Sequence, residues 1–230
     1  MRKYLKILRL ECCMLTLLGT SHIAKQSLNE VRKAIEEGKP DIIALELDRG
    51  RLESLLNPQK QKIRLRDMAR VGIKGWMFAQ LGSWAEKKLG KHVGVAPGAE
   101  MLTAVRLARE KKIPIALIDQ EISITLKRFS KALTWKEKFR FVWDVFAGVF
   151  SRKKPDFDLR TVPTQQVLEK LIGQVKVSYP NVYRVLVTER NHVMANRLYS
   201  LLRANPEKRI LAIVGAGHVE EMERLLHKTI

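Results

Sequence analysis

The 230-residue chain is poor in cysteine and has no long apolar run, and each shortage excludes a class of protein. Its only cysteines, Cys12 and Cys13, are adjacent, and a disulfide between neighbouring residues is strained. A disulfide-stabilised fold is therefore excluded, and a reducing, cytoplasmic compartment is expected. No segment reaches the ~18 consecutive apolar residues that a membrane span needs. The nearest, residues 141–150, contains Asp144.

Two common catalytic motifs are also missing. The chain has neither a Gly-x-x-x-x-Gly-Lys-Ser/Thr phosphate loop nor a Gly-x-Ser-x-Gly nucleophile elbow. Residues 215–217 open like a dinucleotide fingerprint, but Glu220 replaces the third glycine, and the second strand of such a unit has no room to follow. Nucleotide-dependent enzymes and serine hydrolases of these types are disfavoured.

Acidic residues are scarce, with 24 Asp and Glu against 43 Lys and Arg, so the formal net charge is +19. The electric field of such a positive charge favours contact with nucleic acid, anionic lipid or acidic substrates, and the charge alone does not indicate which of these is the partner. No recognisable nucleic-acid-binding motif occurs, so nucleic acid is the least favoured of these partners.

Short apolar runs alternate with helical patterns along the chain. This alternation predicts an α/β fold with a mainly parallel central sheet and flanking helices. The expected strands are residues 14–18, 41–46, 113–118 and 210–214, and the expected helices are residues 27–38, 99–112 and 219–227. The first helix is expected to begin at a capping box that starts with Ser27.

The rest of the chain is assigned around this core. Residues 14–230 are expected to form a single domain, in which about 52–98 and 121–205 are helical insertions that cap the strand ends. Residues 1–13 are a basic extension, either poorly ordered or an additional edge strand.

Polar side chains follow the expected strands. Gly19-Thr20-Ser21-His22 and Gly215-Ala216-Gly217-His218 share the pattern Gly-x-x-His, while Glu46 and Asp119 come after the two other strands. The carboxyl edge of a parallel sheet is where ligands bind, so we expect these side chains to meet there.

Two imidazoles and one carboxylate, here His22, Glu46 and His218, are a common ligand set for catalytic zinc and also suit manganese, iron or cobalt. Hydrolysis is the default chemistry of such a site. Structural roles for the histidines, a surface or helix-capping role for Glu46 and a helix-capping role for Asp119 stay open.

Two further segments carry chemistry-bearing residues. Around residues 187–194, Glu189 would serve as a proton acceptor and Arg190 as an anion clamp, unless this is only a solvated charged face. Residues 127–154 carry nine basic and two acidic residues, with Trp135, Phe139 and Trp143 at helical spacing. Such a stripe either lies on an anionic membrane or packs against its own domain.

The chain resembles the TraB/PrgY family, part of a wider grouping with the Tiki proteases, ChaN-like haem-binding lipoproteins and erythromycin esterases. The matching stretches run in family order. They are residues 18–22, 40–48, 97–101, 117–119 with 125–128, 188–191 with 194–195, and 214–219. The resemblance implies an α/β core with a helical cap and a polar cleft.

The resemblance also implies roles for individual residues. His22, Glu46 and His218 match metal-binding or catalytic positions of the group, within motifs that include Gly19, Ser21, Gly215 and Gly217. Other matching motif positions are Glu100, Asp119, Arg128, Glu189 and Arg190. Asn191 departs from the pattern, because the family usually has an acidic residue there.

The sequence therefore predicts a metal-dependent hydrolase, most plausibly a peptidase, with Mn, Co, Zn or Fe as its divalent ion. Glu189 or Asp119 would handle protons, and Arg128 and Arg190 would stabilise an anionic intermediate or hold a substrate carboxylate. The alternatives are a metal-free, esterase-like hydrolase and a non-catalytic protein that sequesters a signalling peptide. A small-molecule substrate, peripheral membrane contact and a homo-oligomer also stay open.

Overall fold

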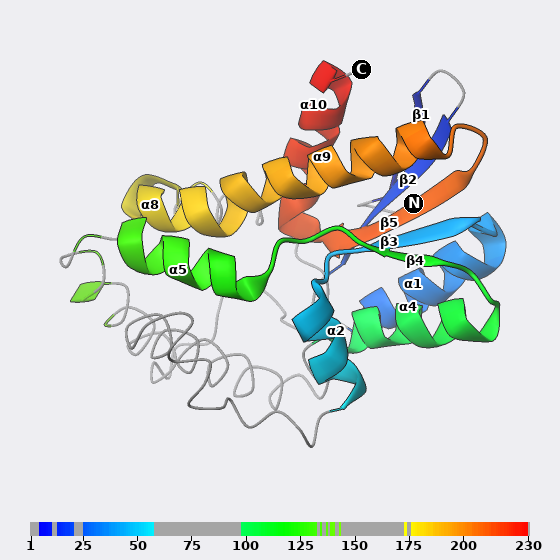
Figure 1. Ribbon diagram of the computed structural model, residues 1–230, viewed down its shortest axis with the longest axis horizontal. Helices are drawn as coiled ribbons and strands as arrows, with labels where there is room; N and C mark the ends of the chain where they lie inside the picture. The colour runs from blue at the N-terminus through cyan, green and yellow to red at the C-terminus, as the bar shows by residue number, and fades with distance from the viewer. Residues whose placement is uncertain are drawn as a thin grey trace.

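The computed structural model describes most of the chain outside two long gaps. The described residues are 5–10, 13–20, 25–57, 98–132, 134, 137, 139–140, 143, 173 and 176–229. Their centre is a five-stranded sheet with helices on both faces (Figure 1). The predicted α/β class is confirmed.

The sheet has the strand order β1-β2-β5-β3-β4. Its strands are β1 (Leu5–Leu10), β2 (Cys13–Thr20), β3 (Ile42–Leu45), β4 (Ile115–Leu117) and β5 (Arg209–Gly215). Only β1 is antiparallel to its neighbour, and the other pairings are parallel. Part of the basic amino-terminal segment therefore forms the additional edge strand, one of the two expected alternatives.

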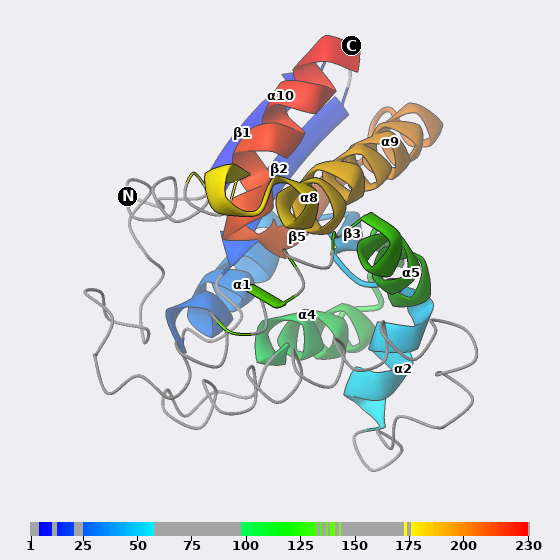
Figure 2. The same cartoon turned by 90° about the vertical axis from the view of Figure 1, so that its left-hand side faces the viewer.

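Within the described part of the chain, helices α1 (Lys25–Gly38) and α4 (Ala99–Glu110) pack on one face of the sheet and helices α9 (Glu189–Ala204) and α10 (Val219–Thr229) on the other (Figures 1 and 2). Helix α1 begins two residues before Ser27, so Ser27 is buried inside the helix and the prediction that it caps the helix is wrong.

Short helices connect these layers to the strand ends. Helix α2 (Arg49–Leu56) follows β3, and α5 (Ile122–Ala132) follows β4. Helix α8 (Pro180–Tyr183) and the π-helix η2 (Arg184–Thr188) lead into α9, while the 3-10 turn η3 (Ala216–His218) leads into α10.

The central strand β5 is buried on both faces, which explains its unbroken apolar sequence. Leu211 and Ile213 belong to the core under α1 and α4, whereas Ala212 and Val214 belong to the core under α9 and α10. Met194 of α9 lies in that second core. Helix α9 lies within residues 121–205, which were expected to form a cap over the strand ends. It packs instead on one face of the sheet and buries it.

Position 98 requires glycine in this fold. Gly98 caps the start of α4 with a φ of +77°, and a Cβ atom there would lie 2.8 Å from Cδ2 of Leu55 in α2. This close approach fixes the first turn of α4, where Glu100 is buried. Among the described residues, no helix has the length and apolar character required to cross a membrane.

Candidate functional site

The four parallel strands end together at one edge of the sheet. Thr20 is level with Gly215, and Ile213 is level with Leu45, which in turn is level with Leu117. The polar residues predicted to follow β3, β4 and β5 therefore lie at the same edge. His22 and Ser21 follow β2 in the sequence, but both lie outside the described residues.

Glu46 is almost completely buried and anchored at both carboxylate oxygens. The backbone N–H of Gly215 donates to Oε2 at 2.5 Å, and Nη2 of Arg190 donates to Oε1. The backbone N–H of Glu46 donates to the carbonyl of Ile213 at 3.1 Å. The alternative of a surface role for Glu46 is therefore wrong.

Asp119 is equally buried, and two arginines hold its carboxylate. Arg190 donates to Oδ1 from Nε at 3.1 Å and to Oδ2 from Nη2 at 2.7 Å. Arg51 donates to Oδ2 from Nη1 at 3.0 Å, and the N–H of Gln120 completes the set at 2.8 Å. Asp119 is therefore part of a charged network.

Arg190 bridges Glu46 and Asp119, and only 15% of its side chain is exposed. Burial alone would lower the pKa of its guanidinium, but hydrogen bonds and opposite charges from the two carboxylates outweigh burial and raise that pKa. Arg190 therefore keeps its positive charge between the two carboxylates.

The backbone before Arg190 is a π-helical turn, η2, which leads directly into α9. Such a turn shifts the following residues around the helix axis and is frequent at functional sites. The carbonyl of Leu186 in this turn accepts a hydrogen bond from Nη1 of Arg190 at 3.2 Å. The turn thus helps to direct the guanidinium into the sheet edge.

His218 lies between Asn191 and Glu46. Its Nδ1 is 2.6 Å from the amide Oδ1 of Asn191, and its Nε2 is 3.4 Å from Oε1 of Glu46. With the amide oxygen of Asn191 facing the ring, Nδ1–H is the donor in this contact, and Nε2 is the ring atom that faces the carboxylate. Asn191 is fully buried, and its Nδ2 has no hydrogen-bond partner among the described residues.

Arg51 is a site residue that the sequence analysis missed. Asp48 caps α2 by accepting from the N–H groups of Gly50 at 2.8 Å and Arg51 at 3.1 Å. This cap directs Arg51 back to the sheet edge, where Nη2 donates to the carbonyl of Glu46 at 2.7 Å. The signal was the capping aspartate two residues after Glu46, which predicts a helix starting beside the site.

Arg128 and Glu189 form a second pair, apart from this network. Both donors of the Arg128 fork contact the Glu189 carboxylate, with Nη2 at 2.8 Å from Oε1, and 58% of the Arg128 side chain is exposed. The hydrogen bond from Arg128 lowers the pKa of Glu189. Glu189 is therefore a weaker proton acceptor than an isolated glutamate, and it joins α9 to α5.

The other residues of the sequence motifs lie in different strands and helices. Gly19 lies in β2, Gly215 ends β5, Gly217 is in η3, and Glu100 is buried in α4. In the described ranges, no group of three or more His, Cys, Asp and Glu side chains could hold a metal ion. The predicted ligand set is thus represented here by Glu46 and His218.

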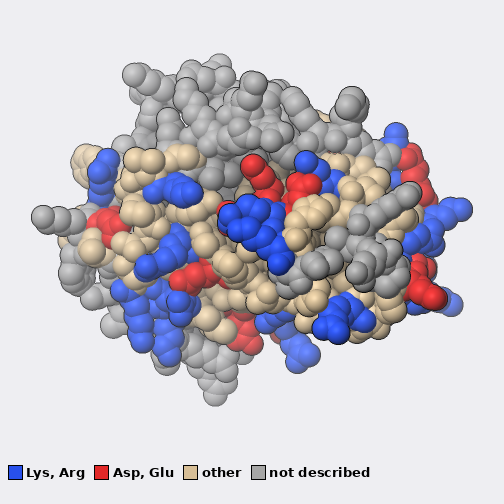
Figure 3. Space-filling view, turned by 90° about the horizontal axis from the view of Figure 1, so that it is seen from above, with Lys and Arg blue, Asp and Glu red and all other residues tan. Residues whose placement is uncertain are grey.

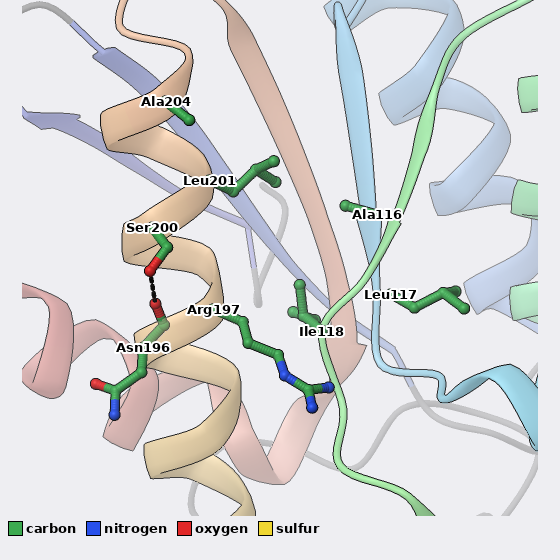
Figure 4. Close-up of a pocket in the computed structure, with 8 residues that line it drawn as sticks. All are labelled: Ala116, Leu117, Ile118, Asn196, Arg197, Ser200, Leu201 and Ala204. Atoms are coloured by element: carbon green, nitrogen blue, oxygen red, sulfur yellow. Dashed lines mark hydrogen bonds between the residues drawn. The ribbon is translucent and has the colours of Figure 1, made fainter.

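A groove of about 450 Å³ lies between α9 and β4 (Figure 4), and Glu46, Arg190 and His218 are not among its lining residues. Its volume is in the range of small-ligand pockets. Ile118 forms part of its floor, and Arg197 reaches across it to donate to the backbone carbonyl of Asp119. The other lining residues are Ala116, Leu117, Asn196, Ser200, Leu201 and Ala204.

Comparison with known proteins places these residues in a wider context. Residues 9–229 match the TraB/PrgY/gumN family. An uncharacterized protein of Methanocaldococcus jannaschii is 37% identical over 218 residues, which cover 94% of this chain and 54% of the relative. TraB domain-containing proteins of Homo sapiens and Mus musculus are 26% and 25% identical, over 90% of this chain and 61% of each relative. The chain thus spans between about half and two thirds of the length of these relatives.

Proposed function

The chain belongs to the TraB/PrgY/gumN family, and we propose that it is a metal-dependent hydrolase acting on peptides. Its reactive centre is the carboxyl edge of the sheet, around Glu46 and His218. The supporting observation is the separation of 3.4 Å between Nε2 of His218 and Oε1 of Glu46. Two ligand atoms on one tetrahedral zinc ion lie about 3.3–3.4 Å apart, given bond lengths of about 2.0–2.1 Å.

The surroundings of His218 also fit a metal ligand. A ligating imidazole commonly donates its other ring N–H to an oxygen, which fixes the tautomer and the ring orientation. Asn191 provides that oxygen at 2.6 Å. In this proposal His22, placed by the sequence after β2, completes the set with Glu46 and His218. A divalent ion held there would lower the pKa of a bound water and polarise a carbonyl group.

The network around Glu46 orients the reactive groups. Arg190 and the N–H of Gly215 fix the Glu46 carboxylate, and Asp119 fixes Arg190. In the proposal Asp119 is an anchor rather than a proton carrier, because arginines occupy both of its carboxylate oxygens. Arg128 is exposed, but both donors of its fork contact Glu189, so it would hold a substrate carboxylate only in exchange for that of Glu189.

A metal-free hydrolase is the second candidate, and one observation favours it. Arg190 donates to Oε1 of Glu46, the same oxygen that faces His218, so a positive charge already stabilises that oxygen. In this alternative Asn191 orients His218 through Nδ1, Nε2 of His218 takes a proton from the attacking water, and the nearby Glu46 carboxylate stabilises the imidazolium that forms.

Metal analysis and peptide cleavage by matched variants distinguish these candidates. The test variant is His22→Ala with His218→Ala, and its control is His192→Ala with His227→Ala, which removes two exposed histidines. The proposal expects the test variant to lose both bound metal and cleavage of a quenched fluorescent peptide library, while the control keeps both. Cleavage that survives exhaustive chelation would favour the metal-free candidate. Peptide binding without turnover would favour sequestration, and metal retained by the test variant would refute the metal site.

A further inference from the structure

We propose that the groove between α9 and β4, named the edge groove, binds the peptide substrate as an added strand that carries an acidic side chain. That the bound peptide is the substrate rests on the hydrolase function proposed above, whereas the binding itself does not. One side of the edge groove is formed by residues 116–118, and the other side by residues of α9, namely Asn196, Arg197, Ser200, Leu201 and Ala204.

The strand β4 has an open edge. It is the last strand in the sheet order, so in the described part of the chain no strand lies on its other side. The carbonyl of Pro114 and the N–H of Ile118 each form a hydrogen bond of 3.0 Å with the backbone of β3. Since successive residues of a strand direct their backbone groups to opposite edges, those of Ile115 and Leu117 point away from β3. An open edge of this kind can pair with an extended peptide.

Leu117 shows that the backbone of β4 borders the edge groove. Its side chain packs against the core under α1 and α4, on the opposite face of the sheet. Figure 4 shows this side chain directed away from α9. Leu117 nevertheless lines the groove, which places its main chain there. A strand added beside β4 would therefore enter the edge groove, with every second side chain on the face of α9.

The two ends of the edge groove differ in chemistry. Figure 4 shows Leu201 and Ala204 level with Ala116, at an apolar end. Arg197 is level with Ile118 and is the one charged residue among the described lining residues. Leu201 lies one turn after Arg197, about 6 Å along the helix, and two residues of a strand span about 6.6 Å. The groove therefore fits an apolar side chain and, two residues away, an acidic side chain.

Arg197 can accept a carboxylate from a bound peptide. Its side chain is exposed, and its Nη1 donates to the backbone carbonyl of Asp119. No carboxylate of the described residues forms an ion pair with it, so the charge of Arg197 is open to an acidic ligand. The Asp119 carboxylate is held by Arg190, which also binds Glu46. The charged end of the edge groove thus lies next to the network of the proposed reactive centre.

An acidic peptide suits the edge groove better than a second copy of the chain. Pairing between two β4 edges would bring together two molecules that each have a net charge of +19. Figure 3 shows Lys and Arg in several groups on one face of the molecule, and their field attracts any acidic peptide. A test must therefore separate Arg197 from this general field.

Fluorescence anisotropy with matched probes and variants makes this separation. The probe is a fluorescein-labelled octapeptide of serines with Val-Thr-Glu at its centre, and the matched probe has Gln in place of Glu. The charge variant is R197Q, and its control R32Q removes an exposed cation from α1, on the other face of the sheet. The variant S200F fills the groove, and its control N29F adds the same side chain to an exposed position of α1.

The wild type is expected to bind the glutamate probe more tightly than the glutamine probe. R197Q is expected to bind the glutamate probe about fivefold more weakly, as for an exposed ion pair, and the glutamine probe as the wild type does. S200F is expected to lose at least about tenfold with both probes, because the phenyl ring occupies the groove. R32Q and N29F should bind like the wild type, and circular dichroism checks that every variant is folded.

Two N-methylated probes examine the pairing with β4. Neighbouring amides of a strand point to opposite edges, so a methyl group blocks pairing at only one of two successive central amides. One methylated probe is expected to bind at least about tenfold more weakly, through loss of a hydrogen bond, and the other to bind like the parent probe. An equal effect of the two methyl groups would refute the added strand.

Three further results would overturn the proposal. The first is a wild type without saturable binding up to about 1 mM probe. The second is an equal loss in R197Q and R32Q, which would assign binding to net charge. The third is a dimer, detected by light scattering, that S200F abolishes, because the groove would then hold a second copy.

The binding and hydrolase proposals can fail separately. Anisotropy is measured with a chelator present and is repeated with the variant that lacks His22 and His218, which should bind the probe like the wild type. Binding without cleavage would refute only the role of the peptide as a substrate. In the cleavage assay, R197Q should raise the KM for the glutamate probe about fivefold, more than it changes kcat. Cleavage with an unchanged KM would show that the substrate does not use the edge groove.

Discussion

Arginine side chains hold glutamate carboxylates both at the sheet edge and between α5 and α9, and these two contacts differ in burial. At the sheet edge Arg190 binds Glu46 and Asp119 in a nearly closed environment, whereas between α5 and α9 Arg128 binds Glu189 at the surface. Breaking a buried pair leaves an uncompensated charge away from water, whereas an exposed pair loses little because water replaces the partner. The same chemical contact therefore has different consequences in the two regions.

The largest expected effect comes from the buried region. Arg190→Met should lower the free energy of unfolding by about 3–5 kcal/mol, because Glu46 and Asp119 stay buried without the cation between them. Urea titration followed by circular dichroism measures the loss. A loss no larger than that of Arg128→Met would contradict the contrast between the regions.

A smaller effect is expected for the second arginine on Asp119. Arg51→Met should cost about 1.5–3 kcal/mol, the usual range for hydrogen bonds to a charged group, because Arg190 still neutralises Asp119. Arg51 is also 30% exposed, so water reaches the position more easily. The same urea titration ranks Arg51→Met between Arg190→Met and Arg128→Met, and any other order would show that burial does not govern the series.

Within the buried region, a substitution of Asn191 is expected to weaken metal binding strongly while it changes stability only a little. Asn191→Leu removes the oxygen that orients His218, but it also removes a buried Nδ2 that lacks a hydrogen-bond partner in the described part of the chain. Stability should therefore change by no more than about 1 kcal/mol. Metal affinity, measured by calorimetric titration with Mn²⁺ and Zn²⁺, should fall by about 10- to 100-fold. An unchanged affinity would show that Asn191 does not orient a ligand.

The smallest effect is expected in the exposed region and depends on pH. Because Arg128 lowers the pKa of Glu189, the pair stabilises the folded state above the pKa of unfolded glutamate and loses this contribution as the pH falls through the folded pKa. Glu189→Gln should therefore be slightly less stable than the wild type at about pH 7, and the difference should shrink and vanish as the pH falls through the lowered pKa of Glu189.

Thermal unfolding of both proteins across this pH range measures that difference. Arg128→Met serves as the control, because it removes the same contact from the other side and should show the same pH dependence. A difference between wild type and Glu189→Gln that grows as the pH falls would be inconsistent with a lowered pKa in the folded state.

The predicted architecture was confirmed where local patterns are unambiguous. The apolar runs before Glu46 and Gly215 are strands of a parallel sheet, because such strands are buried on both faces and need continuous apolar sequence. Boundaries were less accurate. The strand expected over residues 113–118 spans Ile115–Leu117, and Ser27 lies inside a helix that it was expected to cap. Ends of helices and strands depend on contacts that local sequence does not contain.

The candidate site was also predicted only in part. The pattern of polar residues after strands located Glu46, Asp119 and His218, since strand ends converge in any parallel sheet. The pattern could not reveal that Arg190 bridges two carboxylates, or that Glu189, its neighbour in sequence, pairs instead with Arg128. The π-helical turn before α9 and the packing of α5 decide these contacts.

The sequence by itself determined the alternation of core strands and helices along the chain, the positive net charge and the residue types at the sheet edge. These follow from apolar periodicity and composition, which act over a few residues. Only the tertiary structure decided which charges neutralise one another, that Arg51 joins Asp119, and that Phe139 and Trp143 face solvent. The reason is physical: the strength of an ion pair and the exposure of a side chain depend on residues that are distant in the chain and meet only on folding.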